Sequence, residues 1–191
     1  MHSEPLTNDA VVSFDDEPLI LVDSDDNVQG YESKAACHNG EGILHRAFSI
    51  FLFNSKGELM LQKRSDQKRL WPLFWTNSCC SHPRRGESDL QAADRRIFEE
   101  LGVRPKLHFL FRFEYQASFG EAGSENELCS VYIAKSDDEV VVNSNEVAEF
   151  RYVDPDELDA DIEARPELYT PWFKLEWPRI RREFWQRVEG A

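Results

Sequence analysis

Apolar residues in this chain occur in short runs that have the length and composition of buried β-strands. The run Leu19–Val22 ends at an acidic turn, and residues 43–53 form a longer segment that is mostly apolar and rich in β-branched and aromatic residues. A turn over residues 54–57 leads into a return strand over residues 58–64, which predicts a hairpin. Further strands are predicted over residues 107–118, 127–134 and 148–153.

A helical period replaces the strand pattern after residue 87. Ser88 followed by Gln91 is a capping box, and Gly102 suits the residue that ends a helix. Arg96 and Glu100 lie four residues apart, so they share one flank of this helix. The apolar positions that predict its buried face are Leu90, Ala93, Ile97 and Leu101.

Three shorter helical segments complete the pattern. Residues 31–38 predict a helical turn, and Asp154 begins a helix that ends before Pro166. Pro178 is expected to start the last helix. The apolar residues that repeat every four positions in this last helix are Ile180, Phe184 and Val188.

The order of these elements predicts one domain of the α/β (α+β) class, with a mixed β-sheet between helices. The domain is expected to span residues 17–191. Residues 1–16 are polar and acidic, and they are predicted to form a flexible N-terminal extension.

Composition narrows the possible partners. The chain has 191 residues, of which 41% are hydrophobic and 30% charged, and its net charge is -14. Such a surface repels nucleic acids and acidic membranes. No apolar run approaches 18 residues, no signal peptide is evident, and the four cysteines form no Cys-x-x-Cys pair. We therefore expect a monomer in a reducing cytoplasm. Basic residues between positions 63 and 96 stand out against this background and suggest a bound anion.

The stretch of residues 76–83 carries the most specific chemistry. Cys80 lies two residues before His82, and Cys79 is its neighbour. A thiol and an imidazole at this spacing could be a nucleophile–base pair, two metal ligands, or a thiol beside a metal-bound histidine. In an extended segment Cys79 would point away from Cys80, and we interpret it as a small buried residue.

The segment from Glu87 to Val103 resembles the Nudix box, G-x5-E-x7-R-E-U-x-E-E-x-G-U, where U is aliphatic. Two positions differ, because Ser81 replaces the leading glycine and Arg96 replaces a glutamate that helps to hold Mg²⁺ in Nudix hydrolases. With these departures, the sequence is similar to the type I isopentenyl diphosphate isomerases, which have the Nudix fold. The similarity covers residues 17–186, and it depends on the segments WPLFWTNSCCSHP, RRIFEELGV, ENELC, LHRAF and TPW.

The resemblance implies a metal site and a proton-transfer pair. Three imidazoles and two carboxylates are the borderline-to-hard donors expected around Zn²⁺, Mn²⁺ or Mg²⁺. By resemblance, Glu127 also protonates the alkene and Cys80 takes the proton from C2, although the residues alone leave the order of these roles open. Tyr115 is implied to bond to Glu127 and, with a dry pocket, to favour its protonation. The residues matching the ligands of the first metal are His38, His45, His82, Glu125 and Glu127.

The remaining implied roles concern the substrate. Trp172 matches a residue whose ring stabilises a tertiary carbocation. Glu100 matches a ligand of a second ion, Mg²⁺, which arrives with the diphosphate. The residues matching the diphosphate-binding cations are Lys34, Arg64, Lys68 and Arg96. We therefore expect an isomerase that interconverts isopentenyl and dimethylallyl diphosphate, a small-molecule diphosphate substrate. Two rival functions are a Nudix hydrolase and a metal-stabilised module that senses a diphosphate without turning it over.

Overall fold

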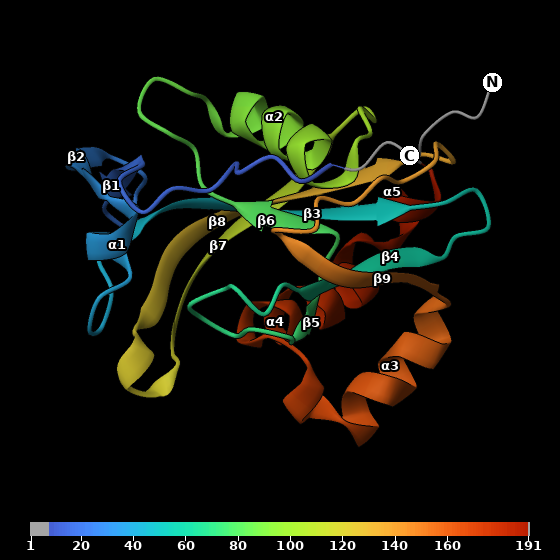
Figure 1. Cartoon of the computed structure of the whole chain (residues 1–191). Helices are drawn as coiled ribbons and strands as arrows, with labels where there is room; N and C mark the ends of the chain where they lie inside the picture. The colour runs from blue at the N-terminus through green and yellow to red at the C-terminus, as the bar shows by residue number, and fades with distance from the viewer. Residues whose placement is uncertain (1–7, 191) are drawn as a thin grey trace.

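The structure is a computed structural model, and it describes residues 8–190. A mixed sheet forms its centre, with helices on both sides (Figure 1). Strand β3 (His45–Phe53) is the central strand of this sheet. It pairs antiparallel with β1 (Pro18–Val22), β4 (Leu59–Arg64) and β6 (Cys79–Ser81), and parallel with β8 (Ser124–Lys135).

Four further strands extend the sheet. β2 (Val28–Ser33) pairs with β1, and β7 (His108–Ser118) pairs with β8. The short helix η1 (Gly120–Ala122) connects β7 to β8. β5 (Trp75–Thr76) and β9 (Val147–Val153) both pair with β4. The predicted mixed sheet between helices is therefore confirmed.

Alternation along β3 creates two cores. Phe48 and Ile50 face helix α2 (Asp89–Leu101), whereas Phe51 and Phe53 face helix α4 (Pro171–Arg179). Successive side chains of a strand point to opposite faces, so a fully apolar strand can serve both layers. The two helices lie above and below the sheet in Figure 1.

Helix α2 begins and ends where its sequence predicts. Ser88 and Gln91 form the capping box, and Gly102 adopts the left-handed conformation, with φ of 72°. The assignment of Leu90 to the buried face of this helix is wrong, because Leu90 is exposed. Asp89 turns toward the sheet instead and accepts hydrogen bonds from Ser130 and Arg112. Because neighbouring residues of a helix point in different directions, Leu90, which follows Asp89, points to solvent.

Two other local predictions are wrong. Residues 31–33 belong to β2, and only Lys34–Cys37 form the short helix α1, capped by Ser33. Pro178 lies inside α4 instead of starting a helix, and Pro171 occupies the first turn. A π-helical segment follows directly, η3 (Ile180–Phe184), as expected where a proline removes a backbone donor.

The remaining helices lie at the C-terminal end of the chain. Helix α3 (Pro155–Ala164) is capped by Asp154 and ends before Pro166, as predicted, and η2 (Pro166–Leu168) follows it. Helix α5 (Trp185–Glu189) is the last described element. None of the helices among residues 8–190 has the length and apolarity needed to cross a membrane.

The predicted N-terminal extension falls partly within the described chain. Residues 1–7 lie outside it, whereas residues 8–16 run beside α2 (Figure 1). Asn8 donates to the carbonyl of Glu99, and Asn143 donates to the carbonyl of Ala10. The boundary expected at residue 17 stays a prediction.

Candidate active site

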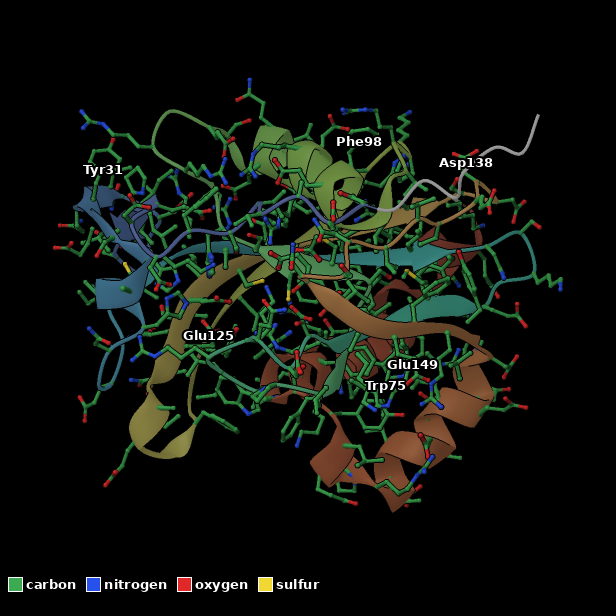
Figure 2. The ribbon with its side chains drawn as sticks, viewed as in Figure 1. Tyr31, Trp75, Phe98, Glu125, Asp138 and Glu149 are labelled. Atoms are coloured by element: carbon green, nitrogen blue, oxygen red, sulfur yellow. The ribbon has the colours of Figure 1, made fainter. Side chains whose placement is uncertain are left out.

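The five predicted metal ligands converge at one end of β3. His38 caps the end of α1, His45 begins β3, and His82 directly follows β6. Glu125 and Glu127 lie two residues apart on β8, and Figure 2 shows Glu125 on that strand. The parallel pairing places His45 opposite Glu127. All five side chains are buried, and one candidate ligand atom from each lies within 4.8 Å of the others.

Backbone carbonyls fix the orientation of two of these rings. Nδ1 of His38 lies 2.6 Å from the carbonyl oxygen of Lys34, and Nδ1 of His45 lies 2.6 Å from that of Ile43. A ring N–H that donates there leaves Nε2 as the free lone pair, which is the arrangement usual for metal-bound histidine. Nε2 of His45 and Nδ1 of His82 are buried without a hydrogen-bond partner, so the cluster has donor atoms available for a cation.

The charges of the cluster also fit a divalent cation. Burial lowers the pKa of His45 to about 4 and lowers the pKa of His82, so both rings are neutral at pH 7. Nε2 of His38 lies 2.8 Å from Glu125, and Nε2 of His82 lies 2.9 Å from Glu127. Burial would lower the pKa of His38 as well, but the charge and the hydrogen bond of Glu125 raise that pKa, and the net shift is upward. Three imidazoles and two carboxylates are the donor types that suit a divalent metal ion.

Glu127 also contacts Tyr115, its register partner on β7. The Tyr115 hydroxyl donates a 2.6 Å hydrogen bond to Oε2 of Glu127. Burial raises the pKa of Glu127 well above its ordinary value, and the neighbouring Glu125 raises it further, whereas the bond from Tyr115 lowers it. The expected help of Tyr115 in protonating Glu127 is therefore wrong in direction, because a donor to the carboxylate favours the charged form. The dry surroundings act as expected.

Cys80 and Cys79 point to opposite sides of β6. Cys79 is buried in the core beneath α2, as predicted for a small core residue. Cys80 packs against the other core and lines the cavity. Nη1 of Arg64 donates to its sulfur at 3.8 Å. Burial raises the pKa of the Cys80 thiol to about 12, although the Arg64 charge opposes this shift.

Trp172 reaches the same cavity from the first turn of α4. Its indole Nε1 donates to Oδ1 of Asn77 at 3.2 Å, and its ring meets that of Trp71 edge-on at 5.4 Å. The Arg64 guanidinium lies 5.2 Å from the centre of the Trp172 ring. A cation can therefore approach the face of this indole within the usual range of cation–π attraction.

One cavity of about 350 Å³ unites most of the predicted site. Cys80, Tyr115, Glu127 and Trp172 line one part of it. Glu100 does not line the cavity but accepts a 2.7 Å bond from Nε of Arg96. The predicted diphosphate-binding residues that also line the cavity are Lys34, Arg64, Lys68 and Arg96.

Several groups in the cavity were not predicted. The Ser13 hydroxyl lines the cavity and accepts from Lys34 at 2.7 Å, and behind the cavity wall the carbonyl oxygen of Val12 accepts from Arg96 at 2.7 Å. Glu146 forms ion pairs with two of the predicted cations. No spacing in the sequence signals these contacts. Asn77, which holds Trp172, lies inside the motif-rich stretch of residues 76–83, and its position there was the one available signal.

Comparisons with known proteins agree with this arrangement. Residues 43–173 match the NUDIX domain family. A structure of DR0079 from Deinococcus radiodurans superimposes with a TM-score of 0.64 at 28% identity, and the match covers 78% of this chain and 90% of that one. These findings and the fold define a NUDIX-domain protein.

Relatives of known name make the assignment more specific. Isopentenyl-diphosphate Delta-isomerase 2 of Photorhabdus laumondii is 43% identical over 91% of this chain and 99% of its own length. Isopentenyl-diphosphate Delta-isomerase 1 of the same organism is 39% identical over 90% of this chain and 99% of its own length. The chain therefore belongs to the isopentenyl-diphosphate Delta-isomerase family.

Proposed function

We propose that this protein interconverts isopentenyl diphosphate and dimethylallyl diphosphate in isoprenoid biosynthesis. The observation that carries the proposal is one cavity lined by a thiol, a buried carboxyl group and a tryptophan, with basic residues in the same wall. Moving an unactivated C=C bond needs an acid and a base on the substrate, together with stabilisation of a cation in the absence of water. These groups supply each requirement.

Proton transfer is assigned to Glu127 and Cys80. Glu127 donates a proton to the terminal alkene carbon of isopentenyl diphosphate, which leaves a tertiary carbocation at C3. The sulfur of Cys80 then takes a proton from C2, and the electrons of that C–H bond form the new double bond between C2 and C3. Burial raises the pKa of Glu127, which supports its role as the proton donor. Burial raises the pKa of the Cys80 thiol to about 12, and the guanidinium of Arg64 beside it is the group that opposes this shift and favours the thiolate that the base requires.

Trp172 stabilises the carbocation between these two steps. The face of an indole attracts a desolvated cation by about 2 kcal/mol or more. Asn77 fixes the ring through its hydrogen bond to the indole N–H. The buried walls around it exclude water, which would otherwise add to the carbocation and give an alcohol.

Metal ions complete the site. The ligand set for the first ion is His38, His45, His82, Glu125 and Glu127, and we propose Mg²⁺, Mn²⁺ or Zn²⁺ there. When bound, this ion orients the Glu127 carboxyl group and neutralises charge in the cluster. A second ion, Mg²⁺, would accompany the diphosphate, and Glu100, which lies behind the cavity wall and is paired with Arg96, would be its ligand on the protein side. Lys34, Arg64, Lys68 and Arg96 bind the phosphate oxygens.

We further propose that residues 17–191 act as a monomeric, cytoplasmic enzyme on a small-molecule substrate, without nucleic acid or membrane partners. The net charge of -14 supports the last point.

The test is incubation of the purified protein with isopentenyl diphosphate and Mg²⁺. The proposal predicts an acid-labile allylic diphosphate and no release of phosphate or pyrophosphate. Phosphate release without an allylic product would indicate a Nudix hydrolase instead. Binding without any turnover, unchanged in Cys80→Ala, would indicate a diphosphate-sensing module.

A further inference from the structure

Glu146 carries a buried carboxylate in the part of the cavity that we assign to the diphosphate. It lies just before β9, where its backbone N–H donates to the carbonyl of Asn143 and its carbonyl accepts from the N–H of Ser65. Only 4% of the residue is exposed, and it lines the cavity. The backbone bonds hold the residue in place, so its side chain reaches the cavity from a fixed position.

This carboxylate is paired with the basic residues proposed to bind phosphate. It forms an ion pair with the ammonium group of Lys68, and its Oε2 lies 2.8 Å from Nη2 of Arg96. Burial alone would raise the pKa of Glu146, but the charges of Lys68, Arg96 and Lys34 lower it to about 2. Glu146 is therefore an anion at neutral pH, and it faces three of the four proposed diphosphate-binding cations.

Its partners explain why an anion is needed there. Arg96 is 2% exposed, and apart from Glu146 its guanidinium pairs with Glu100 at 2.7 Å and with Glu99 at 3.5 Å, both through other nitrogens than the one that faces Glu146. Burial also lowers the pKa of Lys34, with the nearby charge of Lys68 as a second cause. Cations gathered in a dry pocket repel one another, so they require a counter-ion before a ligand arrives.

We propose that Glu146 is an internal counter-ion that competes with phosphate groups for Lys34, Lys68 and Arg96, and so selects diphosphates over single phosphates. This inference rests on the proposed diphosphate-binding role of the cavity. A ligand that binds these cations must share them with a fixed negative charge. Orthophosphate is a single group and can replace Glu146 on fewer of these cations, whereas a diphosphate has two phosphate groups that can engage the three cations together.

The test is calorimetric binding of inorganic pyrophosphate and of orthophosphate, both in the presence of Mg²⁺. Glu146→Gln removes the charge and keeps the shape. We expect it to bind pyrophosphate about tenfold more tightly or better, because a nearby like charge is lost. Orthophosphate should gain more, because it has no second phosphate group with which to recover the contacts that Glu146 takes, so the preference for pyrophosphate falls. A merely structural role predicts the opposite, because misplaced cations would bind both anions more weakly.

Matched variants separate the competing charge from other effects. Glu146→Asp keeps the negative charge and should stay within about threefold of the unmodified protein. Glu149→Gln makes the same change in net charge at an exposed position on β9, labelled in Figure 2, and should not alter binding. Melting curves check that each variant is folded, and Glu146→Ala replaces Glu146→Gln if the latter does not fold.

The outcomes also separate this inference from the proposed function. Unchanged or weaker pyrophosphate binding by folded Glu146→Gln would overturn the inference even if the protein is an active isomerase. Equal tightening in Glu149→Gln or Glu146→Asp would overturn it too, since the local charge would not be the cause. If Glu146→Gln binds pyrophosphate more tightly but the unmodified protein forms no allylic product, the inference stands and the isomerase proposal is refuted.

Discussion

The hydroxyl of Tyr115 donates a 2.6 Å hydrogen bond to the carboxyl group of Glu127, its register partner on the neighbouring strand. This bond stabilises the charged carboxylate, while burial and Glu125 favour the protonated form. In the proposed reaction Glu127 passes from the protonated to the charged form when it donates its proton. Tyr115 is thus placed to stabilise the form of Glu127 that proton donation produces.

Tyr115→Phe tests this relationship. Hydrogen bonds to charged groups contribute about 1.5–3 kcal/mol, so kcat for isopentenyl diphosphate should fall about tenfold to a hundredfold, with KM little changed. Steady-state kinetics measures both constants. Tyr132→Phe is the matched control. Tyr132 lies on β8 but packs into the core beneath α2, on the other side of the sheet from Tyr115, so the kcat of this variant should be unchanged. A loss of the same size in both variants would show that the effect is structural.

The adjacent cysteines allow an internal comparison. Cys80→Ala should abolish most turnover without unfolding the protein, since it removes the proposed base. Cys79→Ala should keep turnover and lose about 1 kcal/mol of stability, because it leaves a small cavity in the core beneath α2. Activity assays and urea denaturation provide the two measurements. An active Cys80→Ala protein would exclude the thiol from the reaction.

Metal removal should affect stability as well as activity. The unmodified protein is expected to retain about one divalent metal ion per chain, measured by plasma mass spectrometry, and to melt at a lower temperature after chelation. His45→Ala should lose the ion, because His45 is fully buried among the ligands. His108→Ala, at the start of β7 and outside the cluster, should retain it. Equal metal content in the two variants would contradict the site.

Glu176 predicts a pH dependence of stability. This glutamate is fully buried on α4 beside the thiol of Cys129, at 3.6 Å, and burial raises its pKa from 4.5 to about 8. The folded chain therefore binds more protons than the unfolded chain between these two pH values. The contribution of Glu176 to stability falls as pH rises through this window, by at most about 1.4 kcal/mol per pH unit.

Urea denaturation at a series of pH values measures this effect. From pH 5 to pH 8 the unfolding free energy of the unmodified protein should fall relative to that of Glu176→Gln, which has no group that titrates at this position. Glu183→Gln is the control, because Glu183 is solvent-exposed on the π-helical segment and its pKa is lowered by hydrogen bonds to Arg182 and Arg179. Parallel pH profiles for Glu176→Gln and the unmodified protein would refute the shifted pKa.

Sequence patterns predicted the elements whose local signals agree with their burial. The capping box at Ser88 and the period of α2 are examples, as is the apolar run of β3. Strand β2 was missed because it is largely exposed and lacks apolar alternation. The start of the last helix was predicted wrongly at Pro178, because α4 continues through this proline. Tertiary packing holds the helix there, since the neighbouring Trp177 is fully buried.

The site was predictable where motifs carry it and not where chain pairing creates it. His82 and Cys80 share one stretch, but the parallel register that sets His45 opposite Glu127 cannot be derived from local spacing. The ion pair between Glu146 and Arg96 connects the turn before β9 to the middle of α2. No residue pattern at either position predicts this contact. Such contacts follow from the packing of the whole fold.

The most direct test of the account follows isopentenyl diphosphate by proton NMR in deuterated water with the metal-loaded protein. The account predicts dimethylallyl diphosphate that carries deuterium in a methyl group, because the exchangeable proton of Glu127 is added to the terminal carbon. Cys80→Ala and Glu127→Gln should each lose most of this product. Release of phosphate or pyrophosphate from a substrate that gains no deuterium and forms no allylic product would contradict the account.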